Sequence, residues 1–183
     1  AYNPYDFSGL RACEARVWSF FRTFDKSMDK YKKHIMGDAS EEPMPLYIIP
    51  DRKVSLADVR EGMRNHYEGT ELSMTNDPGA GAYKVPYRWR PMTFKSEGRE
   101  YFNERAIATQ QTGFVLIAQM RSWLPDAVGG ILWFGVDDAN TAVLTPMYTS
   151  ITEIPECYRR GNGSMTEFSW TSAFWIHNWV ANM

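Results

Sequence analysis

Residues 114–148 read FVLIAQMRSWLPDAVGGILWFGVDDANTAVLTPMY, and they carry the strongest strand signal in the chain. Its apolar runs are bounded by Gly and Pro-Asp turn signals, which is typical of strands. With the run just before it, the stretch predicts four strands, Arg105 to Gln111, Phe114 to Arg121, Ile131 to Val136 and Thr141 to Tyr148. The residues DDAN at 137–140 form a compact turn, so the last two strands are expected to pair as an antiparallel hairpin.

Two of these runs, VLIA at 115–118 and ILWF at 131–134, are apolar without alternation. Strands that are apolar on both sides must be covered on both faces of their sheet. A sheet that lies between a second sheet and a helical layer would satisfy this requirement.

A helical period replaces the strand pattern toward the N-terminus. Apolar side chains spaced by three and four residues predict one helix with a single apolar face. They are Leu10, Cys13, Val17, Phe20, Phe21, Phe24, Met28 and Tyr31. Ser8 is expected to cap this helix, and the basic run before Gly37 suits its C-terminal end.

A second helix is expected to begin at Ser55, with Asp58 in the place of a capping box. Its buried stripe comprises Leu56, Val59, Met63 and Tyr67. Gly69 follows where a left-handed C-terminal residue is needed. From residue 70 to 100 the chain reads as a long ordered surface loop, which includes the dense run PYRWRP at 86–91.

The last helix is expected after Ser169, which is its predicted cap. Its apolar face carries Trp170, Ala173, Phe174, His177 and Val180. The whole pattern predicts an α+β fold in a single domain, 1–183. The domain comprises a helical part (1–36), a helix plus long loop (37–104), antiparallel strands (105–150), and a loop and helix (151–183).

The composition excludes several classes of protein. The 183 residues correspond to one domain at about 150 residues per domain. Twenty basic and 22 acidic residues give a net charge of −2, which argues against a nucleic-acid partner bound through its phosphates. Hydrophobic residues make up 44% of the chain, which excludes wholesale disorder, and no apolar run approaches the length of a membrane span. We therefore expect a soluble protein, whose compartment stays open.

Single motifs indicate little chemistry. The histidines His34, His66 and His177 are far apart, and Cys13 and Cys157 form no metal spacing, so no metal site is expected. Cys13 falls within an apolar stripe, where a small buried hydrophobe is the better interpretation than a reactive thiol. Asp137-Asp138 is either a carboxylate pair for acid–base work or, more simply, a polar turn.

Longer strings are more informative. The chain contains NHYEGT at 65–70, RAIATQQTGF at 105–114, RSWLPD at 121–126, GGILWFGVDD at 129–138, EIPE at 153–156 and GNGSMTEFSW at 161–170. In this order the strings resemble blocks of the PepD-type cysteine dipeptidases. These are N-terminal-nucleophile hydrolases related to the penicillin V and bile-salt amidohydrolases.

The resemblance implies an αββα sandwich, with two antiparallel sheets packed face to face and helices outside. It also implies hydrolysis by an N-terminal Cys whose own α-amino group serves as the base, with no cofactor. This chain begins with Ala1, and both its cysteines are internal. We therefore expect a middle-to-later fragment, truncated at both ends, with its nucleophile upstream and no activity of its own.

The resemblance also indicates site residues. Arg16, in the string ARVW at 15–18, is the candidate catalytic residue, because a guanidinium there would hold the thiolate and stabilise developing negative charge. The alternative is an Arg on a helix flank that extends to solvent. His66, Tyr67 and Glu68 are candidates for binding a dipeptide terminus, although their position before Gly69 suits a helix end equally well.

The expected partners are a dipeptide or short peptide and the remainder of the same polypeptide, with a homo-oligomer as an option. No nucleic acid or membrane partner is expected. The rival hypothesis is a non-catalytic binding module for peptide or carbohydrate, because 15% of the residues are aromatic.

Overall fold

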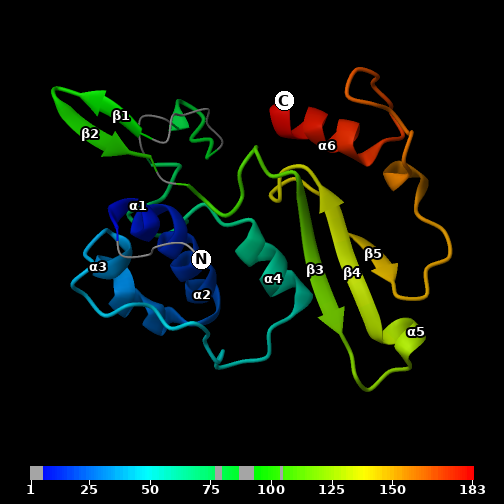
Figure 1. Cartoon of the computed structure of the whole chain (residues 1–183), viewed down its shortest axis with the longest axis horizontal. Coiled ribbons are helices and arrows are strands. Elements are labelled where there is room, and N and C mark those ends of the chain that lie inside the picture. Colours follow the sequence, from blue (N-terminus) through cyan, green and yellow to red (C-terminus); the bar gives the residue numbers. More distant parts are fainter. Residues whose placement is uncertain (1–5, 77–79, 87–92, 104) are drawn as a thin grey trace. The chain divides into compact units, whose positions relative to one another are not determined.

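The computed structural model describes residues 6–76, 80–86, 93–103 and 105–183. Helices and antiparallel sheets are combined in this part of the chain, so the α+β class is confirmed (Figure 1). The chain divides into two compact units, Ala1–Ile107 and Ala108–Met183, which we call unit 1 and unit 2. Most of the predicted aromatic run at 86–91 lies outside the described residues.

Unit 1 begins with a series of short helical segments instead of one long helix. They are α1 (Phe7–Gly9), the π-helical η1 (Leu10–Glu14), α2 (Ala15–Phe24), the 3₁₀ helix η2 (Lys26–Tyr31) and α3 (Lys32–Ile35). The predicted cap at Ser8 is wrong, because the Asp6 carboxylate accepts the hydrogen bond of the Gly9 N–H at 2.5 Å. Asp25 interrupts the predicted helix with extended backbone, and its carboxylate accepts from the Ser27 N–H at 2.8 Å.

The core of unit 1 lies beneath these segments. Trp18, Ile35 and Tyr67 are at most 1% exposed, and they pack with Ala15, Met28, Tyr31, Leu72, Met74 and Ala106. The predicted apolar face is confirmed only in part. Its members Met28 and Tyr31 lie in this core, and Leu10 and Phe24 are also buried. The other four, Cys13, Val17, Phe20 and Phe21, are half-buried, and α2 contributes Ala15 and Trp18 to the core instead. Gly62 permits close packing on α2, since a Cβ there would lie 2.8 Å from the Phe20 ring.

Helix α4 (Leu56–Met63) confirms the predicted capping box. The Asp58 N–H donates to Ser55 Oγ at 3.2 Å, and the Ser55 N–H donates to Asp58 Oδ2 at 2.7 Å. Arg52 adds a forked contact to the same carboxylate, at 2.9 and 2.8 Å. The helix ends before Tyr67. This residue is buried, but it belongs to the turn after the helix and not to the helical stripe in which it was predicted.

The predicted loop at 70–100 contains a hairpin that was not expected from the sequence. β1 (Thr93–Ser96) pairs antiparallel with β2 (Arg99–Phe102) through the two-residue turn Glu97-Gly98. Both turn residues have positive φ, 50° and 76°, as a type I′ turn requires. Phe94 and Tyr101 stack across the hairpin with ring centroids 5.3 Å apart.

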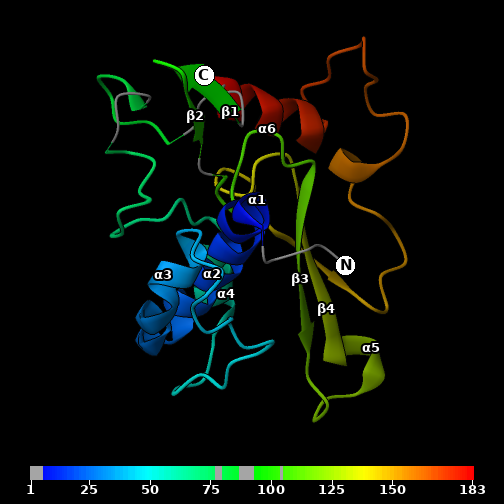
Figure 2. The ribbon, with the colours of Figure 1, turned by 60° about the vertical axis from the view of Figure 1, so that its left-hand side comes forward.

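Unit 2 contains an antiparallel sheet in the order β3-β4-β5, formed by β3 (Phe114–Met120), β4 (Gly130–Val136) and β5 (Thr145–Tyr148). Strands β3 and β4 lie side by side over their whole length (Figures 1 and 2). The predicted hairpin is confirmed, because Phe134 of β4 pairs with Thr145 of β5. The strand predicted at 105–111 is wrong: the Thr112 N–H donates to Thr109 O at 3.0 Å and closes a turn.

Three helical segments complete unit 2: α5 (Asp126–Gly129), the 3₁₀ helix η4 (Glu156–Tyr158) and α6 (Ala173–Asn182). Helix α6 begins after Ser172, so the predicted cap at Ser169 is wrong. The Ser169 hydroxyl instead donates to Asn162 Oδ1 at 2.8 Å and helps to close the turn at 161–163.

The sheet of unit 2 has apolar side chains on both faces, but the expected cover on both faces is not seen within the described residues. Val115, Ile117 and Ile131 are buried on one face. On the other face Phe114, Leu116 and Met120 are 59%, 46% and 75% exposed. We call these three residues the open face of β3.

The capping box predicts a pH-dependent contribution to stability. Hydrogen bonds from Arg52 and Ser55 hold the pKa of the Asp58 carboxyl well below its ordinary value of 3.8. Stability from a depressed carboxyl pKa is present above that ordinary value, and it is lost as the pH falls through the folded-state pKa. Asp58→Asn should therefore lower the melting temperature at pH 7, and the difference should narrow below pH 3.8.

Thermal unfolding between about pH 2 and pH 8, a range that includes the pKa of ordinary carboxyl groups, measures this effect. Asp51→Asn is the matched control, because it removes a neighbouring carboxylate outside the capping box. A constant difference between Asp58→Asn and the wild type at every pH would contradict the prediction.

Candidate functional site

Arg16 lies on α2 directly after the π-helical turn η1. Its Nε donates to the carbonyl oxygen of Ala12 at 2.6 Å. Residues of π-helical turns make longer-range backbone bonds than those of an α-helix, and such turns are frequent at functional sites. This hydrogen bond directs the half-buried guanidinium along the helix surface.

An apolar cavity of about 510 Å³ opens beside this guanidinium. Its wall comprises Cys13, Arg16, Val17, Phe20, Phe21, Met63 and Ile107. The structure thus brings Arg16 and the half-buried, free Cys13 together in one cavity. None of His66, Tyr67 and Glu68 lines this cavity, so the sequence candidates occupy two separate places.

The segment His66–Glu68 is held from both sides by hydrogen bonds. Tyr67 is buried and has a left-handed backbone with φ 64°. Its hydroxyl donates to Arg105 O at 2.8 Å, and its N–H donates to Asn65 Oδ1 at 2.8 Å. Asn65 Oδ1 also accepts from the Ser19 hydroxyl, which ties the segment to α2. The Tyr67 side chain is therefore a core residue.

Glu68 is the exposed member of the segment, and its side chain folds back on His66. The His66 N–H donates to Glu68 Oε2 at 2.7 Å, and the ring Nδ1 lies 3.3 Å from Oε1. Burial raises the pKa of the Glu68 carboxyl, but the hydrogen bonds from the His66 ring and backbone outweigh it, so the pKa lies below its ordinary value. Glu68 is therefore a carboxylate at neutral pH.

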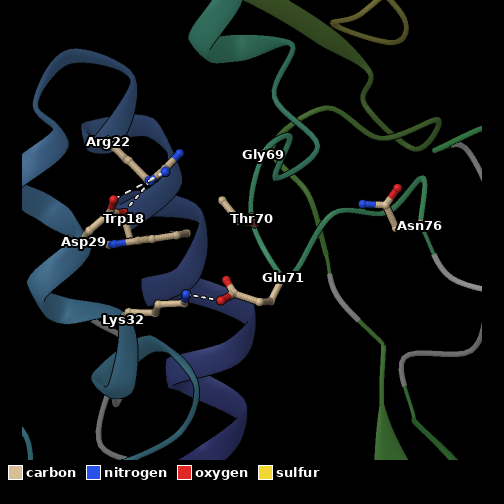
Figure 3. A pocket seen from close by; sticks show the side chains of 8 residues that line it. All are labelled: Trp18, Arg22, Asp29, Lys32, Gly69, Thr70, Glu71 and Asn76. Carbon is tan, nitrogen blue, oxygen red and sulfur yellow. Dashed lines mark hydrogen bonds and ion pairs between the residues drawn. The ribbon is translucent and has the colours of Figure 1, made fainter.

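A second cavity, of about 410 Å³, was not predicted from the sequence, and we call it the polar pocket. It is lined by Trp18, Arg22, Asp29, Lys32, Gly69, Thr70, Glu71 and Asn76. Figure 3 shows Arg22, Asp29 and Lys32 on one side and Thr70 and Glu71 facing them. One wall comes from the helical segments α2, η2 and α3, and the other is the turn that follows Glu68.

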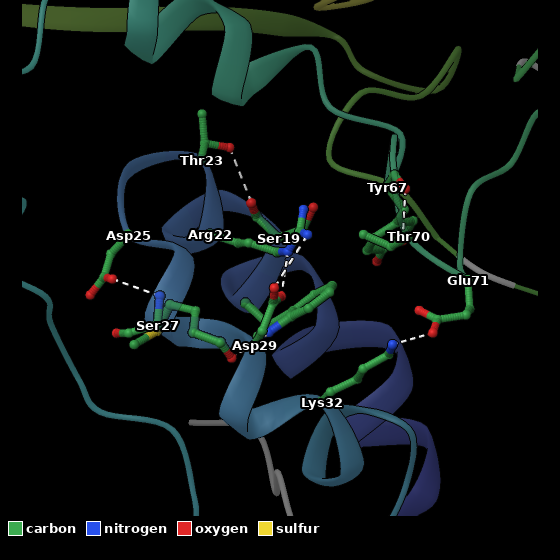
Figure 4. Close-up of polar contacts among 12 residues, drawn as sticks. Ser19, Arg22, Thr23, Asp25, Ser27, Asp29, Lys32, Tyr67, Thr70 and Glu71 are labelled. Carbon is green, nitrogen blue, oxygen red and sulfur yellow. Dashed lines mark hydrogen bonds and ion pairs between the residues drawn. The ribbon is translucent and has the colours of Figure 1, made fainter.

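Two ion pairs lie in the polar pocket. Arg22 Nε lies 2.5 Å from Asp29 Oδ1, and its guanidinium stacks 5.6 Å from the centre of the Trp18 ring. Lys32 Nζ pairs with Glu71 Oε1 across the pocket (Figures 3 and 4). The hydrogen bond from Arg22 lowers the pKa of Asp29, and the one from Lys32 lowers the pKa of Glu71.

The carboxylate pair Asp137-Asp138 lies at the end of β4. The two residues are 4% and 0% exposed. Asp138 Oδ1 accepts from the Asn140 N–H at 3.0 Å, and Asp138 O accepts from the Ala142 N–H at 2.9 Å. This geometry closes a turn, and Asp137 stands in it with a φ of 68°. Oδ2 of each aspartate is buried with no hydrogen-bond partner within the described residues.

In the part of the chain that the structure describes, no three His, Cys, Asp or Glu side chains gather in a way that would hold a metal ion. Within the same residues, every helix is too short or too polar to cross a membrane.

Comparison with known proteins places these features in context. The family model described as peptidase family C69 matches residues 1–183. A probable dipeptidase B of Lactococcus lactis is 29% identical over 181 residues, which cover 96% of this chain and 32% of the relative. Dipeptidase A of Lactobacillus helveticus is 21% identical over 170 residues, which cover 92% of this chain and 30% of the relative.

A probable dipeptidase of Salmonella dublin is 27% identical over 133 residues, which cover 73% of this chain and 25% of the relative. The chain thus spans about a third of the length of the curated relatives that it matches over most of its residues.

Asp137 provides a test of the buried pair. Burial raises the pKa of its carboxyl above the ordinary 3.8, and the negative charge of Asp138 adds to this effect, although a hydrogen bond from Asn178 opposes it. A raised carboxyl pKa makes the fold less stable as the pH rises through the unfolded-state value toward the folded-state pKa. Asp137→Asn removes this cost, and Asn tolerates the left-handed backbone.

The variant should therefore gain stability relative to the wild type as the pH rises from 3 to 7, through the carboxyl's ordinary 3.8. Urea denaturation at intervals across this range measures the difference. Asp126→Asn, at an exposed position in α5, is the control and should show no such trend. Equal differences at every pH would show that the Asp137 carboxyl titrates as an ordinary one.

Proposed function

Because this chain belongs to peptidase family C69, we propose that the protein that carries it hydrolyses dipeptides and other short peptides. The observation that carries the proposal is a family match over all 183 residues, together with relatives named dipeptidases in three bacterial genera. Such a match is stronger support than any single motif, since each string alone could arise in an unrelated fold.

The proposed chemistry is nucleophilic catalysis by a Cys that lies outside this chain. Its α-amino group would take the thiol proton, the thiolate sulfur would attack the peptide carbonyl carbon, and the proton would pass to the leaving amine. Water would then hydrolyse the thioester. Cys13 and Cys157 are internal, so neither carries the α-amino group that this mechanism needs.

The open face of β3 supports the finer proposal about the fold. Exposed apolar area of this kind is typical of a surface that another layer covers. We place the sheet β3-β4-β5 in one half of an αββα sandwich, in a segment of a longer polypeptide. The coverage of about a third of the relatives' length agrees with this placement.

Arg16 is the proposed catalytic residue of this chain. A guanidinium at the edge of an apolar cavity interacts more strongly with a thiolate or an oxyanion than one in bulk water, because the surroundings have a lower dielectric constant. The hydrogen bond to Ala12 uses Nε, and within the described residues the two terminal nitrogens of the fork have no partner, so they could bind the reacting group. The apolar wall of the cavity would then receive a substrate side chain.

His66, Tyr67 and Glu68 are proposed to form one substrate-binding element in which each residue has its own role. Tyr67 anchors the segment in the core, and His66 orients the Glu68 carboxylate through two hydrogen bonds. The exposed carboxylate of Glu68 is the group that would accept a hydrogen bond from an N–H group of the bound peptide near its terminus.

The rival hypothesis, a non-catalytic aromatic binding module, is favoured by one observation. In unit 2, Trp170 packs 4.8 Å from Phe168 and 4.9 Å from Trp179, measured between ring centres, and Trp170 is 64% exposed. Exposed aromatic clusters are common in binding surfaces. Binding of peptides or sugars at these rings, with no hydrolysis by the longer polypeptide, would favour the rival.

The isolated 183-residue chain is expected to have no dipeptidase activity, because the proposed nucleophile and its base lie outside it. Loss of a nucleophile removes on the order of 10⁶-fold in turnover in a comparable hydrolase. The assay is hydrolysis of a mixed dipeptide library by the pure chain, with Cys13→Ala and Cys157→Ala as parallel samples. Activity that one of these substitutions abolishes would place the nucleophile inside the chain.

Arg16→Lys in the longer, active polypeptide should lower turnover by roughly tenfold or more and raise the apparent pKa of the nucleophilic thiol, because Lys lacks the planar fork. Arg11→Lys, on the preceding turn, is the matched control. The pH profile of alkylation by iodoacetamide reports the thiol pKa. A variant with normal turnover and reduced thermal stability would identify Arg16 as a packing residue.

A further inference from the structure

The polar pocket holds four charges in one connected cluster. Besides their direct pairs, Lys32 also lowers the pKa of Asp29, and Arg22 also lowers the pKa of Glu71. Each cation therefore lies within electrostatic range of both carboxylates. The pocket carries two positive and two negative groups, so a ligand of a single charge sign would meet as much repulsion as attraction.

The pair between Lys32 and Glu71 has hydrogen-bonding capacity left over. An ammonium group carries three N–H donors and a carboxylate has two oxygens. Within the described residues, Lys32 Nζ contacts Glu71 Oε1 and no other acceptor, and Glu71 Oε2 receives no side-chain donor. A ligand carboxylate and a ligand ammonium can both bind this pair without breaking it.

The walls of the polar pocket are fixed before any ligand arrives. The ring of Trp18 is 1% exposed, and its Nε1 donates to Met28 O at 2.8 Å. On the opposite wall the Thr70 hydroxyl donates to Tyr67 O at 2.7 Å (Figure 4). The same hydroxyl accepts from the Leu72 N–H at 3.2 Å. Gly69, with φ 69°, turns the chain at this point. A preformed site loses less conformational entropy on binding.

From these observations we propose that the polar pocket binds a zwitterionic short peptide by its two free ends, the carboxylate at Lys32 and the ammonium at Glu71. The volume of about 410 Å³ lies within the usual range for small-molecule sites. This inference rests on the proposed function, because it assigns the place where the peptide's free termini are recognised. It also gives the NHYEGT string at 65–70 a role, because Tyr67 accepts a hydrogen bond from Thr70 and so holds the turn that places Glu71 in the pocket.

The test is a titration of the isotope-labelled chain with L-alanyl-L-alanine, followed by amide NMR shifts. We expect saturable shifts at Gly69, Thr70 and Glu71 and at the indole N–H of Trp18. N-acetyl-L-alanyl-L-alanine amide has the same backbone without either charge, and it should bind roughly tenfold more weakly or worse. Equal binding of the two peptides, or shifts confined to other residues, would overturn the proposal.

Two variants identify the charges. Lys32→Met and Glu71→Gln should each weaken binding of the dipeptide by about tenfold, the usual effect of one charge-assisted hydrogen bond. Lys33→Met is the matched control. Lys33 lies next to Lys32 on α3 but pairs with Glu41 at 3.4 Å, outside the pocket. The affinity of this variant for the dipeptide should equal that of the wild type. A native amide spectrum confirms the fold of each variant. Wild-type affinity in both pocket variants would overturn the assignment.

The result separates this inference from the proposed function. Hydrolysis of dipeptides by the longer polypeptide, with no binding to the polar pocket, would overturn the inference and leave the function. Binding to the pocket by a protein that hydrolyses no peptide would support the pocket and overturn the function.

Discussion

The burial of Tyr67 is the constraint on which the rest of unit 1 depends. A non-glycine residue with a left-handed backbone is strained, and it persists only when its surroundings compensate. Here the ring fills the core beside Trp18 and Ile35, and the hydroxyl reaches Arg105 O, 38 residues later in the chain. The same residue fixes the turn that begins at Gly69. Tyr67 thus takes part in three features of unit 1. It packs in the helical core, it bonds to the later segment at Arg105, and it holds the turn that forms one wall of the polar pocket.

The parts of the fold that could be predicted from the sequence are those in which local chemistry and tertiary packing agree. The capping box at Ser55 and Asp58 needs only residues three apart, and the hairpin β4-β5 needs only a polar turn between apolar runs. The prediction was wrong where a neighbouring side chain could form the competing hydrogen bond. Asp6 took the cap expected of Ser8, and Asp25 interrupted an apolar period that continues on both sides of it.

Other errors came from signals that were given too little weight. The turn Glu97-Gly98 and the stacked pair of Phe94 and Tyr101 together indicate a hairpin, but the nearby prolines and glycines suggested a loop. The polar pocket was harder to find. Lys32 and Glu71 are 39 residues apart, and no periodicity connects a helix with a turn at that distance. Arg16, by contrast, was named from the resemblance of the string ARVW at 15–18 to the family, and its catalytic role stays a proposal.

Side chains at alternating positions of β3 lie in two different surroundings, one buried and one exposed. Val115 and Ile117 pack within unit 2, so their substitutions should be accommodated by changes in the same unit. Phe114, Leu116 and Met120 point to the opposite side and remain 59%, 46% and 75% exposed, although Phe134 of β4 stacks on the Phe114 ring with the ring centres 6.2 Å apart. Because side chains alternate strictly along a strand, the two sets can vary independently. In an alignment of relatives, odd and even positions of this one strand should covary with different sets of residues.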